Sequence, residues 1–120
     1  MKEKLINIPI FDARVILFYG EHIDVEEGIN LKYIDANFTN TLFYKGQYFC
    51  INSGDNIDMC IVLYPESTEE HIYHESLHAS YDILNHLGID VSPENHEVLA
   101  FLMGYIAKEV LQTLNKWRDG

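Results

Sequence analysis

Residues 57–70, IDMCIVLYPESTEE, contain the point at which the sequence changes from strand to helix. The run from Met59 to Tyr64 is almost wholly apolar and β-rich, which predicts a strand inside a sheet. In the segment that follows, Ser67 and Glu70 have the spacing of a capping box, so a helix is expected to start there. The change of period at this point predicts that strands come first and helices follow.

Two helices are predicted after residue 66. The first is expected to run to about Leu87 and to end at Gly88, because glycine favours the backbone conformation that follows a helix. The second is expected to have Ser92 as its N-cap and Pro93 at its first position, and to reach about Trp117.

The first half of the chain reads as β structure. The runs KLINIPIF and RVILFYG predict two strands, and TLFYKGQYFCI predicts a hairpin around Lys45 and Gly46. A single helical turn capped by Asp24 is expected between these segments.

The order of these elements predicts an α+β fold. A mainly antiparallel sheet of about four strands is expected over residues 1–64, with two antiparallel helices over residues 67–117 packed on one of its faces. The length of 120 residues fits one domain, residues 1–120.

Composition excludes some classes of function. Eight basic against 19 acidic residues give a net charge of −11, which disfavours direct binding of nucleic acid. No apolar run approaches the ~18 residues of a membrane helix, and the N-terminus reads as a strand rather than a signal peptide. A cytoplasmic protein with no membrane association is therefore expected, with Cys50 and Cys60 as reduced core thiols.

The first predicted helix contains an HExxH motif, His74-Glu75-Ser76-Leu77-His78. Histidines four residues apart lie on the same face of a helix, so both imidazoles can reach one Zn²⁺. Glu75 lies about 100° around the helix from His74, where a general base can act on a zinc-bound water.

Acidic residues near the motif supply further candidates. Glu97, in the first turns of the next helix, is a candidate third ligand if that helix folds back antiparallel. Ala100 and Gly104 follow it at helical spacing, and such small residues would allow the two helices to approach closely. Asp82, four residues after His78, is expected to accept a hydrogen bond from a ligand imidazole.

These residues resemble the zincin metallopeptidases, specifically the gluzincin branch, in which HExxH on one helix is followed by a glutamate on the next. Glu97 follows His78 by 19 residues, a separation similar to that of the thermolysin-like group, which Asp82 also resembles in its position. The segment EVLAF, from Glu97, is similar to the ligand helix of small intracellular metallopeptidases that cleave phage-type repressors. The resemblance covers about residues 58–105 and suggests a small phage or prophage protein.

The resemblance implies a zinc-dependent metallopeptidase, a hydrolase acting on a peptide or protein substrate. One Zn²⁺ per chain would be held by His74, His78 and Glu97, with the fourth position open for water. Glu75 would take the proton of that water and pass it to the leaving amine. An additional donor for the oxyanion is also expected, and its candidates are Tyr81, Tyr105, His71 and His96.

A function from another class also fits the sequence. The acidic composition is compatible with a non-catalytic inhibitor or assembly protein, for example a DNA mimic, whose metal site is structural or vestigial. A fourth protein ligand, such as His71 or His96, would favour this alternative, because a catalytic zinc keeps a position for water. The sequence gives no indication of the oligomeric state.

Overall fold

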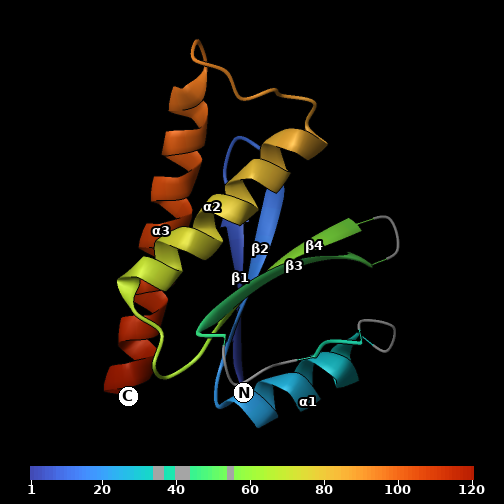
Figure 1. Cartoon of the computed structure of the whole chain (residues 1–120), viewed down its shortest axis with the longest axis vertical. Helices are drawn as coiled ribbons and strands as arrows, with labels where there is room; N and C mark the ends of the chain where they lie inside the picture. The colour runs from blue at the N-terminus through green and yellow to red at the C-terminus, as the bar shows by residue number, and fades with distance from the viewer. Residues whose placement is uncertain (34–36, 40–43, 54–55) are drawn as a thin grey trace.

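A computed structural model of the chain describes residues 1–33, 37–39, 44–53 and 56–120. Figure 1 shows a twisted sheet with helices on both sides. Within the described residues the strands are β1 (Lys2–Ile8), β2 (Ala13–Tyr19), β3 (Gly46–Ser53) and β4 (Asn56–Leu63). The helices are α1 (His22–Lys32), α2 (Glu69–His86) and α3 (His96–Asp119).

The sheet has the strand order β1-β2-β4-β3. The two central strands, β2 and β4, are parallel, and each has an antiparallel partner at an edge of the sheet. The central position of β4 explains why its apolar run from Met59 to Leu63 is buried, as the sequence predicts. The α+β class is confirmed, with a sheet that is mixed but mostly antiparallel.

Each face of the sheet has its own core. Helices α2 and α3 pack on one face, where Ile61 of β4 meets apolar side chains of both helices. Helix α1 covers the other face through Val25 and Ile29, which lie four residues apart and are fully buried. The single turn expected at Asp24 is therefore wrong, since this apolar pair holds an 11-residue helix against the sheet.

The second run of the hairpin expected around Lys45 and Gly46 forms strand β3, which pairs antiparallel with β4. Strand β3 begins at Gly46 and pairs along its length with β4, ending with Ser53 opposite Asn56. Residues 41–43, the start of the expected hairpin, lie outside the described residues. Pairing with the buried strand β4 allows the apolar side chains of β3 to join both cores, which a local hairpin would not provide.

Helix α2 starts one residue later than predicted. Thr68 is its N-cap, and the backbone N–H of Thr68 donates to Nδ1 of His71 at 2.9 Å. Ser67, the expected N-cap, is instead buried: its hydroxyl accepts the N–H of Tyr64 and donates to the carbonyl of Lys45. The helix ends as predicted, with Gly88 at a φ of +72° just after it.

Helix α3 starts at His96, later than the predicted start at Pro93. The side chain of Asn95 accepts hydrogen bonds from both the N–H and the hydroxyl of Ser92, and the N–H of Asn95 donates to the carbonyl of Ser92, so residues 92–95 form a turn before the helix. The shift places Glu97 at the second residue of α3.

Replacing Gly104 by alanine is expected to raise the free energy of unfolding by about 1 kcal/mol. Gly104 is exposed in the interior of α3, and a Cβ built there meets no heavy atom within 4 Å. The expectation that it lies at the α2–α3 contact is wrong, because Leu102 and Ile106 form the buried face of α3. Urea denaturation measures the gain; a loss of stability would show that another surface packs there.

Asp58→Ala is expected to reduce the free energy of unfolding by about 2–4 kcal/mol. The buried carboxylate of Asp58 accepts hydrogen bonds from Arg14 at 3.0 Å and from the hydroxyl of Tyr33 at 2.8 Å. Its removal leaves the tyrosine hydroxyl buried without this acceptor. Urea denaturation measures the loss, and Asp58→Asn, which keeps an acceptor oxygen, should lose less; equal losses would contradict this account.

Candidate metal centre

Helix α2 brings three potential metal ligands together. Nε2 of His74 lies 3.2 Å from Nε2 of His78, and Oε1 of Glu75 lies 3.7 Å from Nε2 of His74. One ligand atom from each of these residues lies within 4.8 Å of the others. Among the described residues, this is the group that can hold a metal ion. The HExxH motif thus forms a cluster on one helix, as its i, i+4 spacing predicts.

The separation of the two imidazole nitrogens matches the geometry of zinc. Two nitrogens bound at 2.0–2.1 Å to one tetrahedral zinc lie about 3.3–3.4 Å apart. The observed 3.2 Å between His74 and His78 is close to this value. The two rings meet edge to face, with centroids 4.9 Å apart and an interplanar angle of 72°. The residues present therefore fit a metal ion of this size.

Glu75 differs from both histidines in its environment. Glu75 is only 5% exposed, whereas His74 and His78 are exposed. Burial raises the pKa of the Glu75 carboxyl above its usual value, while the neighbouring histidines act in the opposite direction. Its Oε2 is buried without a hydrogen-bond partner in the described part of the chain. A buried carboxylate oxygen usually has a hydrogen-bond partner, so this atom indicates that a water molecule or an ion binds beside it.

The edge strand β3 forms the opposite wall of this site. A depression of about 490 Å³ lies between α2 and the start of β3, and it is lined by Thr39, Tyr44, Gly46, Gln47, Tyr48, His74, Glu75 and His78. A Cβ on Gly46 would lie 3.3 Å from Cβ of His71 and 3.4 Å from Cγ of Glu75. Glycine at this position therefore permits the close approach of β3 to α2.

Tyr48 is the residue of this site that the sequence analysis missed. Its ring stacks on that of His78, with centroids 5.9 Å apart and planes at 16°. Its hydroxyl donates to the carboxylate of Asp82 at 2.6 Å. The sequence predicts only that this segment is part of a hairpin, and the missing signal was the pairing that makes β3 an edge strand beside α2.

Asp82 is occupied by partners from β3. In addition to Tyr48, the thiol of Cys50 lies 3.3 Å from the same carboxylate oxygen. The sequence predicts an imidazole of the site as the donor, and the structure places the phenol of Tyr48 between Asp82 and the ring of His78 instead. Cys50 is exposed, so only Cys60 is a core thiol.

Glu97 lies apart from the His74–Glu75–His78 group. Its side chain is 86% exposed, and its Oε1 is 3.4 Å from Nε2 of His96. The motif occupies the sixth to tenth residues of the 18-residue helix α2, whereas Glu97 is the second residue of α3 and does not belong to the metal-ligand group of the described residues. Figure 1 shows the start of α3 at the top of the molecule, away from the first half of α2.

The expected oxyanion donors are also dispersed. Nδ1 of His71 is engaged at the start of α2 with Thr68, although His71 borders an adjoining depression together with His74 and Glu75. His96 contacts the carbonyl of Pro93 at 2.8 Å, and Tyr105 stacks against Phe101. Tyr81 is 49% exposed. In the described part of the chain, Tyr44 and Tyr48 are the phenols that line the main depression.

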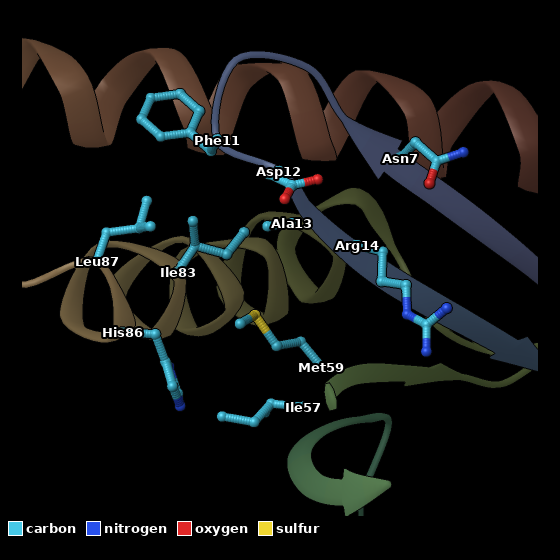
Figure 2. A pocket seen from close by; sticks show the side chains of 10 residues that line it. All are labelled: Asn7, Phe11, Asp12, Ala13, Arg14, Ile57, Met59, Ile83, His86 and Leu87. Carbon is cyan, nitrogen blue, oxygen red and sulfur yellow. The ribbon is translucent and has the colours of Figure 1, made fainter. Parts of the chain in front are cut away.

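A second cavity, of about 400 Å³, lies near the other end of α2 (Figure 2). It is enclosed by the turn between β1 and β2, the start of β4 and the last turn of α2. Apolar side chains, among them Phe11, Met59 and Ile83, surround it in Figure 2, and His86 borders it. His86 is two helical turns beyond His78, or about 12 Å along the axis, so this cavity is separate from the metal-ligand group.

Comparison with known proteins gives no match: neither a family model, nor a curated protein, nor a solved structure is significantly similar to the chain. In the described part of the chain, no helix is both long enough and apolar enough to span a membrane.

Proposed function

We propose that the chain is a zinc-dependent metallopeptidase of the zincin type that acts in the cytoplasm on a peptide or protein substrate. The observation that carries the proposal is the 3.2 Å separation of the His74 and His78 Nε2 atoms beside a buried Glu75 oxygen that has no hydrogen-bond partner among the described residues. Neutral imidazoles and a carboxylate are the donor set that catalytic zinc sites use.

The roles of the residues follow from their positions. His74 and His78 would hold the metal through Nε2, since these two atoms lie 3.2 Å apart. A bound zinc would lower the pKa of a water and polarise the scissile carbonyl. Glu75 would accept a proton from the attacking water as its oxygen bonds to the carbonyl carbon, and would return a proton to the leaving amine nitrogen as the C–N bond breaks. The burial of Glu75 keeps this carboxylate out of bulk solvent.

Glu97 remains our proposal for the third protein ligand, and its position in α3 makes this proposal separately testable. Binding would require its carboxylate, now beside His96, to reach the histidine pair. If Glu97 is a ligand, Glu97→Ala should weaken zinc binding far more than Glu94→Ala, a nearby exposed control. Equal and small effects of the two variants would leave the His74–Glu75–His78 group as the protein's whole contribution.

Metal analysis and proteolysis test the function directly. Protein purified without a histidine tag and supplied with zinc should contain about one zinc per chain and should cleave members of a peptide mixture, detected by mass spectrometry. 1,10-Phenanthroline should stop cleavage, and added zinc should restore it. Failure to bind zinc would overturn the proposal of a metal site. Zinc binding without cleavage of any peptide or protein tested would contradict the peptidase.

The net charge of −11 favours one alternative, an acidic inhibitor or assembly protein in which a metal only joins structural elements. The two functions differ in coordination, because a structural zinc has four protein ligands and a catalytic zinc keeps a water. A crystal structure of the zinc-loaded protein identifies each ligand of the metal. Four protein ligands would favour the alternative, and a coordinated water would favour the peptidase.

A further inference from the structure

Tyr48 contacts two side chains of α2, His78 and Asp82, which lie one helical turn apart. The first is the stacking of its ring on His78, with 5.9 Å between centroids. The second is the 2.6 Å hydrogen bond from its hydroxyl to Asp82, four residues after His78. Because positions i and i+4 share a face of the helix, one rigid phenol connects them both.

These contacts restrict the imidazole of His78. An exposed histidine has several rotamers, and only some direct Nε2 toward a metal shared with His74. The ring of Tyr48 occupies one side of His78, so rotation of the imidazole toward that side is blocked. The phenol is itself fixed by its 2.6 Å hydrogen bond to the carboxylate of Asp82, and hydrogen bonds to carboxylates are among the shorter and stronger ones in proteins.

Two side chains of β3 share the carboxylate of Asp82. The hydroxyl of Tyr48 donates a hydrogen bond to it at 2.6 Å. The thiol of Cys50 contacts the same oxygen of Asp82 at 3.3 Å, and belongs to the same strand. Strand β3 is thus attached to α2 through one carboxylate, beside the histidine pair.

We propose that Tyr48 is a positioning residue of the metal centre: anchored by Asp82, its ring holds the imidazole of His78 in the orientation that binds metal. The inference rests on the proposed metal site, and it adds that the edge strand β3 sets the metal affinity of α2. Asp82 acts on His78 through Tyr48, by fixing the phenol, and not by accepting a proton from the imidazole.

Zinc titration of three variants tests the inference. Residues that orient a metal ligand typically contribute 10–100-fold to metal affinity, so Tyr48→Ala should weaken zinc binding by about that factor. Tyr48→Phe keeps the ring and should lose less, about 3–10-fold, by the same reasoning. Tyr73→Ala is the matched control, since it removes an exposed tyrosine of α2 that lies outside the metal-ligand group, and it should change affinity by less than about 2-fold.

A double-mutant cycle with Asp82→Ala separates positioning from general packing. Tyr48→Phe and Asp82→Ala remove the same hydrogen bond, so the double variant should bind zinc no more weakly than the weaker single variant. Fully additive losses would overturn the proposed connection. Tyr48→Ala with unchanged zinc affinity, measured on protein that is still folded by circular dichroism, would overturn the positioning role itself.

The metal-free protein provides a readout that does not depend on zinc binding. In NMR spectra, ring protons of Tyr48 and His78 should show mutual contacts, and Tyr48→Phe should preserve them. In Tyr48→Ala the imidazole should average over several rotamers. If the wild type binds no zinc, the proposed function fails. If Tyr48→Ala leaves the His78 rotamer unchanged, the positioning role fails, whether or not zinc binds.

Discussion

Replacement of His78 by alanine is expected to weaken zinc binding by at least about 10³-fold, a loss greater than any change outside the ligand set should cause. His74 and His78 bring the only pair of imidazole nitrogens in the metal-ligand group of the described residues to 3.2 Å from each other. Without His78, a single imidazole and Glu75 remain in that group. Isothermal titration with a competing chelator of known affinity measures the change.

His86→Ala is the matched control for this experiment. It removes a histidine from the same helix, eight residues further on, where Nδ1 contacts the carbonyl of Asp82 rather than a ligand. Both histidines are exposed, so neither change should unfold the protein. Equal zinc affinity of His78→Ala and the wild type would remove the HExxH motif from the metal site, and an equal loss in His86→Ala would indicate an effect on α2 as a whole.

Glu75→Gln is expected to reduce peptide hydrolysis by 10²–10⁴-fold, the range typical for loss of a general base, while about one zinc per chain is retained. Glutamine has nearly the same shape as glutamate, so it fits the buried position, but its amide cannot accept the proton of the attacking water. The expected signature is therefore a lower kcat with little change in zinc content. Turnover of a cleaved peptide and metal analysis of the same sample provide both values.

Two comparisons make the Glu75 experiment decisive. Glu70→Gln alters another glutamate of α2, on the border of the adjoining depression but outside the metal-ligand group, and it should hydrolyse the same peptide at close to the wild-type rate. Hydrolysis by Glu75→Gln at the wild-type rate would exclude Glu75 as the base. A loss of zinc together with activity would instead assign Glu75 to the ligands.

Much of the fold could be predicted because it depends on local patterns. The apolar run of β4 predicts a strand covered on both faces, and Gly88 predicts the end of α2, since each depends on residues close in sequence. The sequence predicts too short a helix at α1, because only one apolar pair of this helix, Val25 and Ile29, packs on the sheet. The length of α1 is set by that contact rather than by the helix propensity of its residues.

The sequence by itself determined the central cluster of the candidate site. Histidines four residues apart on a helix meet whatever surrounds them, so His74 and His78 are brought together by helix geometry alone. The same geometry places Glu75 beside them, and its burial against β3 follows from the packing of α2 on the sheet.

Only the tertiary structure decided what faces this cluster. Tyr48 is 30 residues from His78 in sequence, and it reaches the site because β3 pairs with β4 and becomes the edge strand next to α2. The path of the chain after Gly88 places Glu97 beyond the far end of α2. The identity of such neighbours depends on strand order and on the course of connecting segments, which spacing in the sequence does not specify.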